Sequence, residues 1–187
     1  MVLVLLAPGF EEIEALVPVD VLRRAGHPVT LVSVTPEESR EVTGAHGITV
    51  RTDDWIGSVD IRQSRLLVLP GGMPGTSNLE QNEAVREAVR AQMTEGRLLG
   101  AICAAPTIPG RMGLLQGRRA TCYPGLEESL LGAKTSQDPV VVDGNLVTSR
   151  GPGTAMAFGL ALAEALSGSP EKTREMAGRL LAGESAS

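Results

Sequence analysis

Aromatic, cysteine and histidine residues are scarce in this sequence, and each shortage excludes something. Aromatic side chains make up 2% of the 187 residues, too few for the stacking platform on which single-stranded nucleic acids bind. The formal net charge of -5 also argues against a nucleic-acid partner, because phosphate backbones are bound by basic surfaces. Two cysteines are too few for a disulfide scaffold, and a zinc site of four Cys and His ligands would use every such residue. We therefore expect no nucleic-acid partner and no metal.

Long hydrophobic runs are also lacking. No apolar run reaches the roughly 18 residues of a membrane-spanning helix, so we expect no membrane partner. The first apolar run, Val2–Leu6, is closed by Pro8-Gly9 and follows no basic leader, which indicates a strand and not a signal peptide. A cytoplasmic location is then the simplest expectation. The 42% hydrophobic content suffices for one core, and we expect residues 1-187 to form a single domain.

Short apolar runs alternate along the chain with segments of helical periodicity. Four apolar runs predict buried strands: Val2–Leu6, Val29–Val34, Arg65–Leu69 and Leu98–Ile102. Helices are predicted over 11–25, 82–94, 154–166 and about 170–182, with shorter helical stretches from Cys103 to about Leu115 and over 125–131. Such alternation is typical of an α/β fold, in which a mostly parallel sheet has helices on both faces.

Other segments carry more specific expectations. Residues 41–51 suggest a hairpin, Val140–Val142 and Leu146–Thr148 predict a second one, and Ala120–Tyr123 predicts a short strand. In the helix over 82–94, Asn82 is expected to cap the N-terminus. The side chains expected to face the core are Ile13, Leu16, Val17 and Val21 in the first helix and Ala84, Val85, Ala88 and Val89 in the other. The predicted core covers about 2–166, and a polar tail ends the chain.

Cys103 is the first candidate for catalysis. It directly follows the predicted strand Leu98–Ile102, and ligands of such sheets bind at the carboxyl ends of the strands. A nucleophile on a sharp turn between strand and helix is held exposed above the sheet, and the start of the helix favours a thiolate. The alternative is an inert, buried cysteine, which describes most free cysteines. The position at the end of a strand favours the functional interpretation.

Glu14 and a glycine-rich loop are further candidates. Pro18 cannot donate a hydrogen bond to the carbonyl of Glu14, so the helix is irregular where this carboxyl lies. Glu14 could equally be a first-turn acid favoured by the helix dipole, and Glu11 and Glu12 are interpreted in that way. The glycine amides of residues 71–75 could bind an oxyanion, or the segment could simply be a tight turn.

Both histidines, His27 and His46, precede Cys103. A cysteine nucleophile with a downstream histidine, as in glutamine amidotransferases, is therefore excluded. Cys103 is followed by Ala104, so the Cys-His pair of PfpI-type peptidases is missing too. Cys122 precedes Tyr123 on a short predicted strand, and if Tyr123 faces a pocket, Cys122 points away from it.

Five ordered motifs make the chain resemble the ThiJ/PfpI superfamily, in the branch of the parkinsonism-associated deglycase (DJ-one) and its bacterial relatives. The motifs are Gly9-Phe10-Glu11-Glu12-Ile13-Glu14, Val17-Pro18-Val19-Asp20-Val21-Leu22-Arg23-Arg24-Ala25-Gly26, Leu69-Pro70-Gly71-Gly72, Ala101-Ile102-Cys103-Ala104-Ala105-Pro106 and Thr148-Ser149-Arg150-Gly151-Pro152-Gly153-Thr154. The resemblance extends from about residue 2 to 166. It implies a flavodoxin-like three-layer sandwich that forms a homodimer.

The resemblance also implies roles for individual residues. It assigns the reactive cysteine to Cys103, a protonated acid hydrogen-bonded to the sulfur to Glu14, and an oxyanion site to the amides of Gly72 and Ala104. Arg24 would lie near the dimer interface. The residues implied to line the pocket are Gly71, Tyr123, His46, Ser149 and Pro152.

Two residues depart from the pattern of the family. Tyr123 stands where fuller relatives carry a histidine, and tyrosine is a poor base near neutral pH because its reference pKa is about 10. His46 aligns with an arginine that some relatives place near the pocket, and it could partly replace that arginine as an anion contact.

The resemblance implies a cofactor-independent cysteine enzyme that converts small dicarbonyls, such as methylglyoxal or glyoxal, to 2-hydroxy acids. Early glycation adducts are the alternative substrates of a deglycase. A second hypothesis is a stress sensor or redox-regulated chaperone in which Cys103 oxidises to a sulfinate that Glu14 stabilises. A third is a domain used only for association. The first two share Cys103 and Glu14, so they cannot be separated from the sequence.

Overall fold

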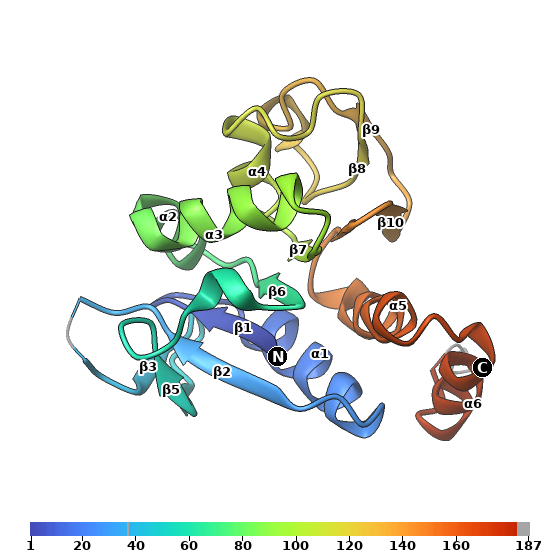
Figure 1. Cartoon of the computed structure of the whole chain (residues 1–187), viewed down its shortest axis with the longest axis horizontal. Helices are drawn as coiled ribbons and strands as arrows, with labels where there is room; N and C mark the ends of the chain where they lie inside the picture. Colours follow the sequence, from blue (N-terminus) through green and yellow to red (C-terminus); the bar gives the residue numbers. More distant parts are fainter. Residues whose placement is uncertain (37, 183–187) are drawn as a thin grey trace.

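A seven-stranded sheet forms the centre of the computed structural model, which describes residues 1–36 and 38–182 (Figure 1). The strand order is β10-β11-β7-β6-β1-β2-β5. These strands are β1 Val2–Leu6, β2 Val29–Ser33, β5 Asp54–Trp55, β6 Leu66–Leu69, β7 Leu98–Ile102, β10 Val140–Asp143 and β11 Leu146–Ser149. Neighbours pair in parallel except β10 and β11, which form the predicted antiparallel hairpin. The predicted α/β fold with a mostly parallel sheet is confirmed.

Helices cover both faces of this sheet. The α-helices are α1 Glu12–Arg24, α2 Gly75–Gln81, α3 Glu83–Thr94, α4 Thr107–Arg111, α5 Ala155–Ser167 and α6 Pro170–Arg179, and the 3-10 helices are η1 Ile61–Gln63, η2 Glu127–Ser129 and η3 Pro152–Thr154. Successive side chains of a strand point to opposite faces, so Leu3 and Leu5 of β1 join one core while Val4 and Leu6 join the other. The first core packs against α2, α3 and α4, and the second against α1 and α5.

Two small sheets lie outside the central one. β3 (Glu41–Thr43) pairs antiparallel with β4 (Thr49–Arg51), which is the hairpin predicted over 41–51. β8 (Arg119–Ala120) pairs in parallel with β9 (Lys134–Thr135). Of the strand predicted over Ala120–Tyr123, only Ala120 is therefore part of a paired strand.

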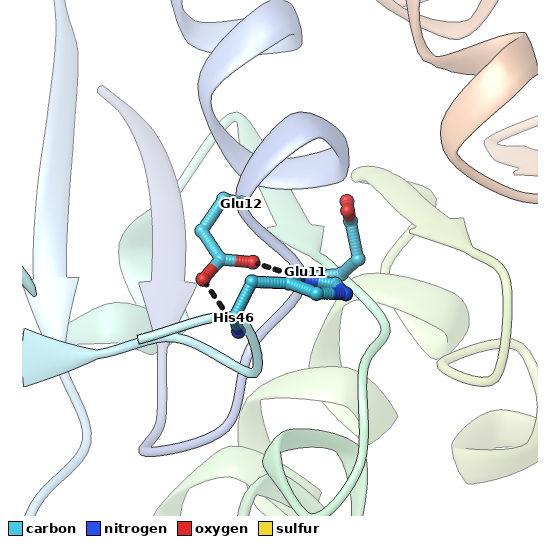
Figure 2. A group of neighbouring side chains, drawn as sticks. All are labelled: Glu11, Glu12 and His46. Carbon is cyan, nitrogen blue, oxygen red and sulfur yellow. Dashed lines mark hydrogen bonds and ion pairs between the residues drawn. The ribbon is translucent and has the colours of Figure 1, made fainter. Parts of the chain in front are cut away.

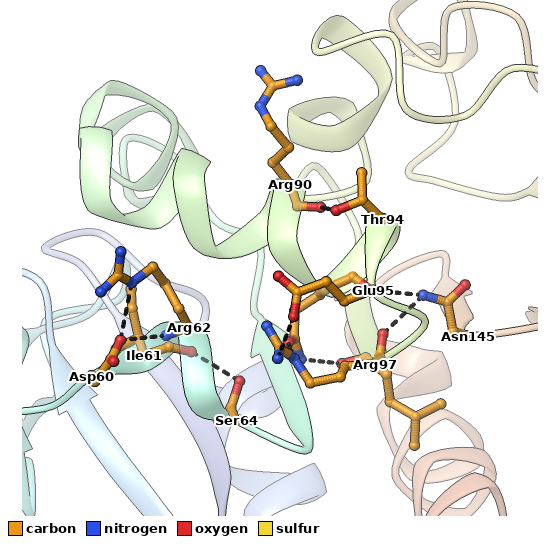
Figure 3. Close-up of polar contacts among 11 residues, drawn as sticks. Asp60, Ile61, Arg62, Ser64, Arg90, Thr94, Glu95, Arg97 and Asn145 are labelled. Carbon is orange, nitrogen blue, oxygen red and sulfur yellow. Dashed lines mark hydrogen bonds and ion pairs between the residues drawn. The ribbon is translucent and has the colours of Figure 1, made fainter.

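The hairpin of β10 and β11 is tied to the end of α3 (Figure 3). Asn145, in the turn between these strands, donates hydrogen bonds to the carbonyls of Gln92 and Arg97, each over 2.9 Å. Arg97 in turn donates to Gln92 Oε1 over 2.7 Å. These bonds fix the β10–β11 hairpin, whose strand β11 pairs with β7, and Cys103 directly follows β7.

Several predictions about local structure are wrong. Ile13 is 50% exposed, because α1 packs through Ala15, Pro18, Val19, Val21 and Leu22. Ala84 is exposed as well, although Val85, Ala88 and Val89 are buried and Asn82 caps α3 as predicted. The helical stretch after Cys103 is confined to α4 because turns occupy the residues on either side. No prediction covered α2, whose sequence has little apolar periodicity.

The C-terminal helix α6 ends at Arg179, near the end predicted for it, and the polar tail of residues 183–187 lies outside the described residues. Among the residues that the structure describes, no helix has the length and apolar character needed to cross a membrane.

Candidate active site

Cys103 forms a sharp turn directly after β7. Its φ of 64° lies in the left-handed region, which costs of order 1–3 kcal/mol for a residue with a side chain. Two hydrogen bonds hold the turn: the Cys103 N–H donates to the Ser149 carbonyl over 3.0 Å, and the Cys103 carbonyl accepts from the Tyr123 N–H over 2.9 Å. The side chain is half-buried. The thiol is thus fixed at the carboxyl end of the strand, as the sequence predicts.

The carboxyl group of Glu14 reaches the thiol from the first turn of α1. Glu14 is fully buried, and its side chain hydrogen-bonds to that of Cys103. Oε2 of Glu14 also accepts from the N–H of Gly71 over 2.9 Å. Oε1 is buried and has no hydrogen-bond partner within the described part of the chain. One oxygen therefore accepts while the other is free to carry a proton.

The surroundings of Glu14 favour its neutral form. Burial, reinforced by the negative charge of Glu11, raises the pKa of Glu14 from 4.5 to about 7, although hydrogen bonds from Cys103 and Gly71 lower it. Glu11 also caps α1, because its Oε2 accepts from the N–H of Glu14 over 2.7 Å. A substantial fraction of Glu14 is consequently protonated at neutral pH.

The pKa of Cys103 differs from the expected low value. Burial raises the pKa of the thiol to about 12, and the charge and hydrogen bond of Glu14 add to this effect. The helix that was expected to favour a thiolate begins only at Thr107. Glu14 raises the pKa of the Cys103 thiol only while its own carboxyl is ionised. The pair of side chains therefore takes up one negative charge more readily than a second.

Two main-chain amides favour a negative charge on the sulfur. The N–H groups of Ala104 and Gly72 both hydrogen-bond to Cys103 and lower its pKa. Gly71 and Gly72 of the glycine loop are both required by packing: a Cβ on Gly71 would lie 2.6 Å from the Cβ of Cys103, and one on Gly72 would lie 2.4 Å from the nitrogen of Glu11. The glycine loop can therefore be a tight turn and an oxyanion site at the same time.

The remaining candidates occupy different places. Tyr123 is 49% exposed, and its ring lies 3.5 Å from the position that a Cβ would take on Gly151, beside Glu14. The buried Ser149 uses its hydroxyl on the Pro139 carbonyl and on Thr154, and its main-chain carbonyl supports the Cys103 turn.

Pro152, Arg24 and Cys122 lie in three different places. Pro152 is half-buried at the start of η3. Arg24 is exposed at the far end of α1, where it forms an ion pair with Asp20 over 2.6 Å, roughly 15 Å along the helix from Glu14. Cys122 is buried in the core on the opposite face of the sheet, and burial raises the pKa of its thiol to about 11.

Glu11, Glu12 and His46 form a second polar cluster next to Glu14 (Figure 2). One donor atom of each lies within 4.8 Å of the others, a spacing that a metal ion could bridge. Glu12 uses both oxygens on His46, however, and Glu11 caps α1. We therefore describe the cluster as hydrogen-bonded and assign no metal to it. Interpreting Glu11 and Glu12 only as dipole-favoured acids missed their burial, which leaves 7% and 5% of each exposed.

The chain is similar to known proteins over most of its length. The profile of the DJ-1/PfpI family matches residues 1–165, and the chain belongs to this family. It is 43% identical over 182 residues to Protein DJ-1 homolog B of Arabidopsis thaliana, covering 96% of this chain but 41% of that longer protein. It is 36% identical over 177 residues to a glutathione-independent glyoxalase of Caenorhabditis elegans (93% and 92% covered). The identity to a deglycase of Pyrococcus abyssi is also 36%, over 159 residues (84% and 93% covered).

Solved structures show the same fold. Oxidized DJ-1 of Toxoplasma gondii superposes with a TM-score of 0.91 at 35% identity, covering 97% of this chain and 98% of that one. DJ-1beta of Drosophila melanogaster superposes with a TM-score of 0.87 at 39% identity, covering 96% of each chain.

Proposed function

We propose that this protein is a cofactor-independent cysteine enzyme that converts small reactive dicarbonyls to 2-hydroxy acids. The observation that carries the proposal is the contact between Cys103 and the buried Glu14, with two amide N–H groups directed at the same sulfur. The family includes proteins named as a deglycase and as a glutathione-independent glyoxalase, which supports carbonyl chemistry of this kind.

In the proposed mechanism, the sulfur of Cys103 attacks the aldehyde carbon of methylglyoxal as its proton passes to Glu14. The N–H groups of Gly72 and Ala104 stabilise the developing oxyanion, which takes the proton back from Glu14 to give a hemithioacetal. Glu14 then removes the hydrogen of the former aldehyde carbon and returns it to the neighbouring carbon. The hydroxyl proton moves to the oxygen of that neighbouring carbon, which leaves a thioester of lactic acid. Water hydrolyses the thioester, so that one dicarbonyl and one water give lactate and the free thiol.

Lactate formation from methylglyoxal without glutathione tests this proposal. We expect Cys103→Ser to abolish turnover and Glu14→Gln to lower kcat by about 10²–10⁴-fold, the usual contribution of a proton-transfer group. Cys122→Ser is the matched control and is expected to retain turnover, because Cys122 faces the opposite core. Intact turnover in either active-site variant, with correctly folded protein, would show that the mechanism is wrong.

A second candidate function is sensing of oxidants through Cys103. The unpartnered Oε1 of Glu14 favours it, because a protonated oxygen there could donate to a sulfinate on Cys103. Intact mass after mild peroxide separates the two functions. Selective gain of two oxygens at Cys103, with negligible lactate formation, would support sensing.

We also propose that the protein acts in the cytoplasm. In addition, we propose that it forms a homodimer. Two large apolar side chains near the site are exposed, Ile13 of α1 at 50% and Ile48 of the β3–β4 hairpin at 55%. A second copy that covers them would remove apolar area from water.

A further inference from the structure

One buried carboxylate, that of Glu12, helps to attach the β3–β4 hairpin to the site. This hairpin is not part of the central sheet. The carboxylate of Glu12 accepts from the main-chain N–H of His46 over 2.8 Å through Oε1, and Oε2 lies 2.8 Å from His46 Nδ1. The N–H of Ile48 also hydrogen-bonds to this carboxylate. The tip of the hairpin thus closes around Glu12.

Main-chain bonds complete the attachment. The N–H of Gly9 donates to the Thr43 carbonyl over 2.9 Å, and the N–H of Ala45 donates to the Phe10 carbonyl over 2.8 Å. Gly44 lies so close that a Cβ there would be 2.4 Å from Glu12 Oε1. The hairpin therefore holds the segment Gly9–Glu12 from one side.

The same segment contacts the catalytic loop on its other side. The N–H of Glu11 donates to the Gly71 carbonyl over 2.9 Å, and the N–H of Gly75 donates to the Gly9 carbonyl over 3.2 Å. Gly71 itself donates to Glu14, and the neighbouring Gly72 directs its N–H at Cys103. The segment Gly9–Glu12 thus lies between the hairpin and the glycine loop, and the loop contacts the sulfur.

We propose that Glu12 and His46 form a clasp that positions the Gly9–Glu14 segment and the glycine loop against Cys103, and that protonation of His46 tightens it. His46 is a positioning residue in this scheme, since it contacts Glu12 and not the reacting atoms. The proposal concerns the site of the proposed enzyme, but its test needs no turnover.

Charge makes the clasp sensitive to pH. The charged groups that face the imidazole are Glu12, which is 5% exposed, and Glu11, which lies within 4.8 Å. Their carboxylates raise the pKa of His46, chiefly through the Glu12 hydrogen bond. Below that pKa the bond joins a cation to an anion, whereas above it a neutral imidazole must hold its proton on Nδ1 to donate at all.

Hydrogen exchange of the hairpin amides tests the clasp. After correction for intrinsic exchange, we expect the protection of the Ala45 and His46 amides to fall about two- to five-fold between pH 6 and pH 8, the range of one exposed ion pair. His46→Asn keeps a donor near the Nδ1 position but cannot titrate, so its protection is expected not to change with pH. His27→Asn, which removes the other histidine, is expected to retain the wild-type change.

Alkylation of Cys103 by iodoacetamide, located by mass spectrometry, reports the effect on the site. We expect His46→Ala to slow alkylation at pH 8, because the Gly72 amide loses its fixed position, and His46→Asn to recover most of the rate. The clasp is overturned if His46→Ala matches the wild type in both hairpin exchange and alkylation. The proposed function could still hold in that case, since it would be judged by lactate formation alone.

Discussion

A carboxyl group that is fully buried beside a thiol is costly to ionise, and Glu14 is in that position. The neighbouring Gly71 amide and Cys103 compensate only part of the loss of hydration, which is why the pKa of Glu14 is raised to about 7. Ionising Glu14 therefore lowers the free energy of unfolding, because water hydrates the same carboxylate freely in the unfolded chain.

We predict that Glu14→Gln changes how stability depends on pH. The folded protein keeps the Glu14 proton up to about pH 7, whereas the unfolded chain releases it near 4.5. Wild-type stability therefore falls as pH rises through this window, and the penalty is complete above it. Unfolding in urea should show the variant gaining roughly 2–3 kcal/mol relative to wild type between pH 5 and pH 8. Parallel stability curves for the two proteins would contradict the raised pKa.

The sequence indicated the central residues of the site because strand ends are readable from it. Cys103 follows an apolar run that ends in the sheet, and Gly71-Gly72 follows another. The high pKa of the thiol could not be read in this way, because it depends on burial and on a carboxyl group 89 positions earlier in the chain. The role of Glu12 was missed for the same reason, since its partner His46 comes from a separate hairpin.

At the scale of elements, strands were better predicted than helix faces. Continuous apolar runs identify strands that are buried on both faces, as β1 and β7 are. Helix faces depend on neighbours: Ile13 fits an apolar stripe but points away from the α5 side of the core. The α2 segment Gly-Thr-Ser-Asn-Leu-Glu-Gln buries one large apolar residue, Leu79, and gives no periodic signal.

The cap of α3 provides a prediction at this scale. Asn82 accepts from the N–H of Val85 over 3.2 Å and satisfies one of the free amides at the start of the helix. We expect Asn82→Ala to lower the free energy of unfolding by about 1 kcal/mol, measured in urea, and to leave lactate formation unchanged. Asn82→Asp should retain most of the stability. A loss of activity without a loss of stability would argue that α3 has a role in the site that the contacts do not suggest.

At the scale of the whole molecule, the homodimer proposal predicts where a second copy binds. Mass measurement by light scattering should give twice the 19.5 kDa of one chain. The double variant Ile13→Ser and Ile48→Ser should shift the protein toward the monomer, because it removes the exposed apolar side chains near α1 and the hairpin. Leu131→Ser is the control, since Leu131 is similarly exposed at 52% but lies beyond η2. A dimer that the double variant leaves intact would place the interface elsewhere.

The pH dependence of Cys103 alkylation, compared between wild type and Glu14→Gln, tests most directly whether the two side chains share one negative charge. We predict that the wild-type rate inflects near pH 7, where the pair releases its first proton, and that Glu14→Gln lacks this inflection. Superimposable profiles for the two proteins would show that Glu14 does not control ionisation at Cys103 and would contradict the account.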